Sequence, residues 1–294
     1  MMPRWFLLVP LLTLLSACGT LSRSGGYFQD DGPDAHPPAD AANIPDAVPK
    51  PEPRAASGND SYSVDGTTYT PLAEANGYHE RGIASWYGKK FNGKRTSSGE
   101  PYDMYAMTAA HKTLPLPSYV RVRNLQNGRS VIVRVNDRGP FLHNRLIDLS
   151  YAGAAKLGIL GTGTGVVEIE AINLEEPAVQ VAQVQEPALE LVSSAAAADG
   201  ASSSPQVPAT PKLYLQVGAF TQRDNAMHLR DRLERAALRP VFIQSAPALT
   251  GRAPDAAPIF YRVRIGPLTN VEEGDRLTER AAQLGIPDAQ IVVE

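Results

Sequence analysis

The chain has a single cysteine, Cys18, among 294 residues. One cysteine can form neither an intramolecular disulfide nor a thiolate metal cluster. The histidines are scattered, and His79, His111 and His143 show no His-x-Glu-x-x-His or other ligand spacing. The sequence therefore predicts no metal and no other cofactor. It also lacks the Gly-x-Ser-x-Gly turn of a serine nucleophile, which argues against that hydrolase class.

Long apolar runs are missing as well, since the run at residues 5–15 is too short to span a bilayer. It leads into Leu-Ser-Ala-Cys at 15–18, which resembles a bacterial lipobox. In that interpretation residues 1–17 are a removable signal, and Cys18 carries acyl chains such as palmitate. Gly19 after the cysteine favours the periplasmic face of the outer membrane, by analogy with bacterial sorting rules. The alternative is an ordinary secretory signal with an incidental cysteine. Either predicts export, which disfavours a nucleic-acid partner.

Proline and glycine, by contrast, are plentiful at 25 and 24 residues. Residues 18–78 are rich in Pro, Asp and Ala without apolar periodicity, so we expect a disordered tether behind the lipidated cysteine. Residues 176–211 are rich in Ala and Pro and predict a second linker. Two domains remain, at 79–175 and 212–294, which fits a prior of roughly 100–200 residues per domain.

The first domain is predicted to be rich in β-structure. Residues 119–124 alternate apolar and polar side chains, as a half-buried strand does. Asn127-Gly128 then supplies a tight turn, and residues 130–136 return as the next strand. Ser150 is placed to cap a short helix at 152–157.

The second domain contains an internal repeat. Leu-Gln-Val-Gly-Ala-Phe-Thr at 215–221 is echoed by Val-Arg-Ile-Gly-Pro-Leu-Thr at 263–269. Each copy precedes an amphipathic helix and then a strand, so the element order is βαββαβ. This order predicts a ferredoxin-like sheet with two helices on one face.

Five motifs lie in register between residues 82 and 150: ASWYG, TSSGE, YAMTAAHKTLPL, VRVRNLQNGRSVIVRVNDRGPF and RLIDLS. This stretch resembles the RlpA ("rare lipoprotein A") family, whose fold is a double-psi β-barrel. In the second domain YLQVGAF and YRVRIGP resemble the SPOR domain, a peptidoglycan-binding module. The expected fold class is therefore mainly β plus α+β, a double-psi β-barrel followed by a βαββαβ SPOR domain, with disordered linkers.

The resemblance implies an enzyme, an endolytic peptidoglycan lytic transglycosylase. Such a lyase cleaves the β-1,4 bond between N-acetylmuramic acid (MurNAc) and N-acetylglucosamine (GlcNAc) and leaves 1,6-anhydroMurNAc ends. It also implies a preference for strands without stem peptides, enrichment at the division septum, a role in cell division and contact with divisome proteins. The alternative is a septal lipoprotein that binds peptidoglycan without cutting it, as expansin-like barrels do, because fold does not fix function.

Glycosidic cleavage needs a carboxylic acid to protonate the leaving oxygen. In a lytic transglycosylase one carboxyl suffices, because the MurNAc C6 hydroxyl attacks its own C1. Asp137 follows an apolar strand and precedes Gly139-Pro140, so it is the candidate acid. The alternative is that Asp137 pairs with Arg138 or Arg134, or caps the turn. A hydrolase would need a second carboxylate as base.

The resemblance implies supporting roles in the active site for Glu100 and His111, namely orienting the sugar, hydrogen-bonding Asp137 or relaying its proton. From the residues alone they are a surface-turn glutamate and a partly buried structural histidine. Glu100 or Asp103 would be the base of a hydrolase, and Asp103 is otherwise structural or secondary. Trp86 and Tyr87 can stack on sugar rings, although Trp86 fits a core position equally well.

In the second domain, strand alternation places one set of side chains on the sheet face opposite the helices. We expect this face to bind glycan, with an ordinary outward face or a domain contact as the alternative. Its residues are Tyr214, Gln216, Phe220, Arg262 and Arg264.

Overall fold

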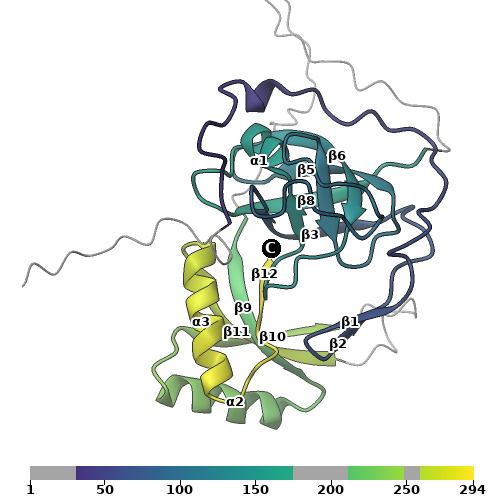
Figure 1. Ribbon diagram of the computed structural model, residues 1–294. Coiled ribbons are helices and arrows are strands. Elements are labelled where there is room, and N and C mark those ends of the chain that lie inside the picture. Colours follow the sequence, from purple (N-terminus) through teal and green to yellow (C-terminus); the bar gives the residue numbers. More distant parts are fainter. Residues whose placement is uncertain (1–30, 175–210, 248–258) are drawn as a thin grey trace, which may run out of the picture.

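The computed structural model describes residues 31–174, 211–247 and 259–294 of the chain. The predicted signal, Cys18 and residues 176–210 of the predicted second linker lie outside these ranges. Within them, no helix is both long and apolar enough to cross a bilayer. Figure 1 shows two domains, a barrel and a smaller sheet with two helices.

Six strands close into a barrel in the order β3-β7-β4-β6-β5-β8. The pairs β3–β7 and β4–β6 are parallel and the other pairs are antiparallel. Closure leaves no free strand edge. The predicted double-psi β-barrel is thus confirmed, and its strands are β3 (His79–Trp86), β4 (Thr108–His111), β5 (Ser118–Asn124), β6 (Ser130–Asp137), β7 (Ile147–Leu149) and β8 (Gly165–Ala171).

The barrel interior is built by the alternation visible in the sequence. Val120 on β5 and Val133 on β6 are Cα partners, and both are fully buried. The predicted helix is α1 (Tyr151–Leu157), which begins where the Ser150 hydroxyl accepts the Gly153 N–H at 3.1 Å. Together these elements fix the end of β6, where Asp137 lies.

The second domain has the predicted βαββαβ order. Its sheet is antiparallel with the strand order β10-β11-β9-β12, the ferredoxin-like arrangement. Leu215 on β9 and Leu233 on α2 are fully buried in the core between sheet and helices. The elements are β9 (Leu213–Phe220), α2 (Arg223–Arg235), β10 (Val241–Pro247), β11 (Ile259–Leu268), α3 (Val271–Gln283) and β12 (Gln290–Val293).

The expected tether at 18–78 differs from the structure from residue 31 onward. Figure 1 shows residues 31–78, in purple and dark blue, wrapping the outside of the barrel. We call this segment the strap. Ala41 is buried against the barrel, and the backbone N–H groups of Ala47 and Ala55 donate to barrel carbonyls at 3.0 and 2.8 Å. The strap has no periodicity of its own because its partners are barrel groups distant in sequence.

The strap also contributes regular structure. It contains the short 3₁₀ helix η1 (Ala41–Asn43) and a hairpin of β1 (Tyr62–Val64) and β2 (Thr67–Tyr69). The hairpin turns at Asp65 and Gly66, both with positive φ. It therefore presents Tyr62 and Tyr69 as Cα partners.

The two domains meet along one interface. The Arg145 guanidinium of the barrel donates to both oxygens of Asp275 on α3, at 3.1 and 2.6 Å. Asn144 donates to the Thr278 hydroxyl at 2.9 Å and accepts the Ile291 N–H at 2.8 Å. We call these contacts the latch. Apolar barrel residues also pack against the core of the second domain, namely Ile83, Leu125 and Val166.

Candidate active site

Asp137 ends β6, and its carboxylate is held through one oxygen. Oδ1 accepts the Ser97 N–H at 2.8 Å, the Ser97 hydroxyl at 2.7 Å and the Arg138 N–H at 2.7 Å. Oδ2 accepts no hydrogen bond from residues 31–174 or the other described ranges. Because Oδ1 receives only donors, a proton on this carboxyl belongs on Oδ2. The residue is partly exposed.

Arg138 and Arg134, the alternative ion-pair partners of Asp137, bind other groups with their guanidinium ends. The Arg138 guanidinium donates to the carbonyls of Gly58, His111 and Leu114 at 2.8, 3.0 and 2.6 Å. Arg134 binds two glutamates. The structure therefore shows no side-chain ion pair between Asp137 and either arginine. The backbone N–H groups of Ser97 and Arg138 on Oδ1 do fit the other alternative, a carboxylate that caps the turn.

Glu100 lies beside the end of β6 as an ion-paired carboxylate. Arg134 donates to its two oxygens at 2.7 and 2.9 Å, and the Asn136 amide donates at 3.0 Å. The hydrogen bonds from Arg134 hold the pKa of Glu100 below its ordinary value, against the opposing effect of partial burial. Glu100 is thus ionised at neutral pH and is unsuited to donate a proton.

Arg134 also joins the strap to this site. Its Nε and Nη2 donate to the two oxygens of Glu52, each at 2.9 Å. Tyr119 donates a further hydrogen bond to Glu52. The resulting chain of alternating charges, Glu52–Arg134–Glu100, is only partly exposed. Because each charge has an opposite neighbour, the network keeps Glu100 in a fixed place.

His111 is buried, with 2 % of its surface exposed, and its ring accepts hydrogen bonds from backbone N–H groups. Its Nδ1 accepts the N–H groups of Thr113 and Leu114 at 3.1 and 2.9 Å, so Nε2 carries the hydrogen and donates to the Tyr78 hydroxyl at 3.1 Å. Burial lowers the pKa of His111 to about 3. The expected hydrogen bond to Asp137 is not among its contacts, and a neutral ring that holds a turn replaces the expected proton relay.

Asp148 is a second carboxyl, which the sequence analysis did not single out. It lies on the same rung of the barrel as Asp137, meaning that both aspartates pair with the same residue of β4. Ala110 on β4 is the Cα partner of Asp137 on one side and of Asp148 on the other. The Ser85 hydroxyl donates to Asp148, and desolvation raises the pKa of this carboxyl to about 6. The available signal was an aspartate between Ile147 and Leu149 in an otherwise apolar strand.

The barrel aromatics expected to stack on sugars lie in the core. Trp86 and Tyr87 are 9 % and 8 % exposed. Trp86 packs edge-on against Tyr151, and Tyr87 stacks on Tyr102 with ring centroids 4.0 Å apart. Both side chains are nearly buried, so the core position replaces the expected sugar platform. Asp103 is exposed and accepts the Tyr105 N–H at 2.9 Å within a turn.

On the sheet of the second domain, a β-bulge changes which side chains share a face. Gly218 is paired with Val263 but Gln216 with Arg264, so one residue of β9 between them has no partner. Beyond the bulge the alternation is inverted. Phe220 therefore packs with the core toward α2, beside Gly218, and not on the open face where the sequence placed it.

Four of the five expected face residues do share the side opposite the helices. The Arg264 guanidinium lies over the Tyr214 ring at 5.9 Å and donates to Gln216 at 3.5 Å. It also forms an ion pair with Glu294, and it is only 3 % exposed. Arg264 is thus buried and holds neighbouring side chains of this face together, while Arg262 is more exposed to solvent.

In the described ranges no three His, Cys, Asp or Glu side chains gather as a metal site. What the barrel offers is two carboxyl groups on one rung, Asp137 and Asp148, and an ion-paired third, Glu100. Carboxyl groups placed in this way can perform acid–base chemistry.

Two family models match the chain. Residues 79–170 match a model described as "Lytic transglycolase", and residues 209–292 match the SPOR domain. A crystal structure of the RlpA SPOR domain from Pseudomonas aeruginosa aligns at 32% identity, covering 27% of this chain and 96% of that chain with a TM-score of 0.24.

Curated relatives share the name endolytic peptidoglycan transglycosylase RlpA. The protein of Pseudomonas aeruginosa strain UCBPP-PA14 is 42% identical over 285 residues, 84% of this chain and 81% of that protein. The protein of Vibrio cholerae is 50% identical over 167 residues, 57% of this chain and 64% of that protein. With both domains matched in order, this chain belongs to the RlpA family.

Proposed function

We propose that this chain is an endolytic peptidoglycan transglycosylase in which Asp137 is the single acid and then base. Its substrate is the β-1,4 bond between MurNAc and GlcNAc. The observation that carries the proposal is the Asp137 carboxyl, oriented by three donors on Oδ1 with Oδ2 left for a ligand. The names of the curated relatives support the same reaction.

The steps balance with one carboxyl and no water. Protonated Asp137 gives its Oδ2 proton to the glycosidic oxygen, and the bond from MurNAc C1 to that oxygen breaks. GlcNAc leaves with a free O4 hydroxyl. The MurNAc C6 hydroxyl then bonds to C1, and its proton passes to Asp137. The carboxyl is restored, and the product is a 1,6-anhydroMurNAc end.

Glu100 and His111 have supporting roles in this proposal. Glu100, fixed by Arg134, holds the Asn136 amide next to Asp137 and offers a carboxylate edge to sugar hydroxyls. His111 is a positioning residue that orders the turn at Thr113–Leu114, whose Leu114 carbonyl binds Arg138. Both act on Asp137 through its neighbours in the chain, Asn136 and Arg138.

Asp148 favours a second candidate reaction. Its raised pKa and its place on the rung of Asp137 suit a proton donor opposite a base. A hydrolase would then use Asp148 as the acid and Asp137 as the base that activates water, whereas the sequence suggested Asp137 as the acid with Glu100 or Asp103 as the base. The two reactions differ in their products, because hydrolysis leaves a reducing end that contains an oxygen from water.

The finer features of the family belong to the proposal as well. Export and lipidation at Cys18 would anchor the chain at the periplasmic face of the outer membrane. The SPOR match supports recognition of peptidoglycan, which we propose to be septal strands without stem peptides. Encounter with divisome proteins would follow from that location, and no cofactor is needed.

We expect faster glycan release from sacculi treated with an amidase than from intact sacculi. Stripped strands expose the glycan to both domains, so the expected difference is about tenfold or more, or about 1.4 kcal/mol of differential binding. The measurement is the rate at which the full-length protein releases soluble glycan from each preparation.

Equal rates would contradict the preference for stripped strands. A protein that binds both preparations and releases nothing from either would instead be the non-catalytic wall-binding lipoprotein.

A further inference from the structure

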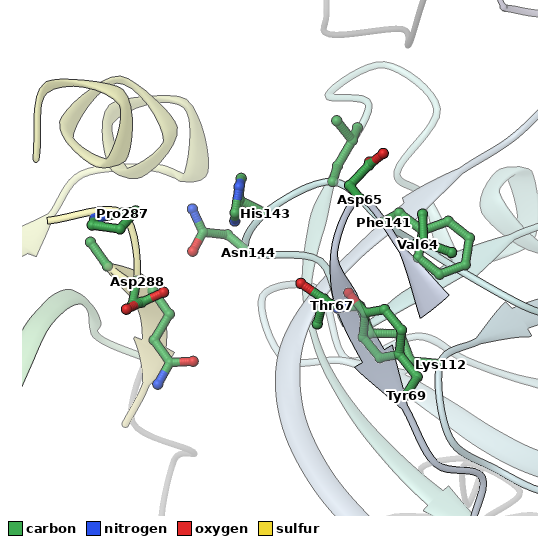
Figure 2. Close-up of a pocket in the computed structure, with 13 residues that line it drawn as sticks. Val64, Asp65, Thr67, Tyr69, Lys112, Phe141, His143, Asn144, Pro287 and Asp288 are labelled. Carbon is green, nitrogen blue, oxygen red and sulfur yellow. The ribbon is translucent and has the colours of Figure 1, made fainter. Parts of the chain in front are cut away.

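A cleft lies between the two domains, next to the loop that follows Asp137. Figure 2 shows it with Pro287 and Asp288 of the second domain on one side and Thr67 and Tyr69 of the strap hairpin on the other. The cleft has a volume of about 380 Å³, within the common range for ligand pockets of roughly 300–1,000 Å³. Loop residues 141–144 of the barrel also line it.

A second hollow of about 370 Å³ lies beside the residues that hold Asp137. Its walls include Ser97 and Arg138, the two residues whose donors hold the Asp137 carboxylate. Val64 and Phe141 line both hollows. The two hollows therefore adjoin at Val64 and Phe141, and we call them together the groove.

Aromatic rings line the middle of this groove. Tyr62 and Tyr69 stack with centroids 5.3 Å apart, and the Phe141 ring lies 6.1 and 5.7 Å from them. Phe141 remains 39% exposed. Rings that support one another stay in place and offer flat apolar surfaces, which suit the apolar face of a pyranose. These three rings, unlike Trp86, border open space.

The two ends of the cleft supply polar groups. Thr67 from the hairpin and Gln290 from β12 offer a hydroxyl and an amide. Lys112 also lines the cleft, and its ammonium uses one donor on the Arg145 carbonyl at 2.5 Å. Two more donors of that ammonium suit a carboxylate, such as the lactyl group of MurNAc.

The latch holds the walls of the cleft together. Asn144 lines the cleft and bonds to Thr278 and to the backbone of Ile291, and its neighbour Arg145 holds Asp275. The cleft is therefore complete only when the second domain is docked on the barrel.

We propose that this groove is a distal glycan subsite built jointly by the strap hairpin, the barrel loop and the second domain. It would hold the sugars of one strand several units away from the bond at Asp137. The inference rests on the proposed function for the identity of its ligand, a MurNAc–GlcNAc strand. The subsite makes cleavage depend on strand length, because only a long strand reaches from Asp137 to Gln290.

The test uses Tyr69→Ala and Gln290→Ala, one variant for each wall, with Thr68→Ala as the matched hairpin control that does not line the cleft. Stripped glycan strands of defined length, short and long, serve as substrates. We expect each wall variant to lower kcat/KM for long strands by about fivefold or more and to leave short strands unchanged. Equal losses on both lengths, or no loss on either, would overturn the subsite.

A binding measurement separates this inference from the catalytic proposal. In an Asp137→Asn background, calorimetry with long stripped strands should show weaker binding for Tyr69→Ala than for Thr68→Ala. If that difference appears while Asp137→Asn still cleaves, the subsite stands and the assignment of the acid fails. If Tyr69→Ala binds as tightly as the control, the subsite fails whatever the cleavage result.

Discussion

Asp137→Asn should abolish glycan release while the protein stays folded. Asparagine keeps an oxygen at Oδ1 for the donors from Ser97 and Arg138, so the end of β6 should retain its geometry. It loses the only proton that Oδ2 can deliver. Because general acid catalysis contributes roughly 10²–10⁴-fold, and Asp137 serves as acid and then base, we expect a loss of about 10³-fold or more in rate.

The measurement is the initial rate of soluble glycan release from amidase-treated sacculi, together with the thermal unfolding midpoint. Asp103→Asn is the matched control, an exposed aspartate in the same barrel, and should retain activity. Asp148→Asn decides between the two carboxyls on the rung. If Asp148→Asn is inactive while Asp137→Asn works normally, then Asp148 is the acid and the present assignment is wrong.

The free energy of unfolding should fall as the pH falls below 6.5, and His111 should account for a definite part of the change. The unfolded chain protonates this histidine near its ordinary pKa of 6.5, whereas burial delays protonation in the folded state to about pH 3. Between these values the unfolded state binds more protons, so acid favours unfolding. The difference in proton binding implies a loss of about 2 kcal/mol between pH 7.5 and pH 5 from this residue.

His111→Asn isolates that contribution. The asparagine oxygen can replace Nδ1 as acceptor for Thr113 and Leu114 but does not titrate in this range. Denaturant unfolding of both proteins at pH 7.5 and pH 5 should therefore show the smaller decrease for the variant, by about 2 kcal/mol. An identical decrease in both proteins would mean that His111 takes up its proton equally in the folded and unfolded states, and this account of the pH dependence would be wrong.

The strands of both domains were predictable because alternation and turn residues are local signals. β5 and β6 of the barrel and the repeat of β9 and β11 carry their patterns within a few residues. The strap was not predictable, since Ala41 and Glu52 are stabilised by barrel groups far away in sequence. Its composition resembles that of a linker because the barrel, and not the strap, supplies the partners. The placement of the two domains depends on Arg145 and Asp275 in the same way.

The candidate site was predictable in part. Asp137 stood out because a carboxylate follows an apolar strand there, and the structure leaves one of its oxygens for a ligand. The orientation of His111 depends on nonlocal packing, which the sequence pattern does not carry. Phe220 faces the core because of a single bulge in β9, a shift that strict alternation cannot anticipate. Asp148 could have been found from the sequence only as the one polar residue between two apolar residues of β7.

The central claim is that the chain cuts without water, and its most direct test is product analysis in ¹⁸O-labelled water. The full-length protein is incubated with amidase-treated sacculi, and the released glycans are examined by mass spectrometry. The proposed mechanism predicts 1,6-anhydroMurNAc ends, lighter by one water than reducing ends and free of ¹⁸O. Reducing ends that carry ¹⁸O would contradict it and would establish that the chain is a hydrolase.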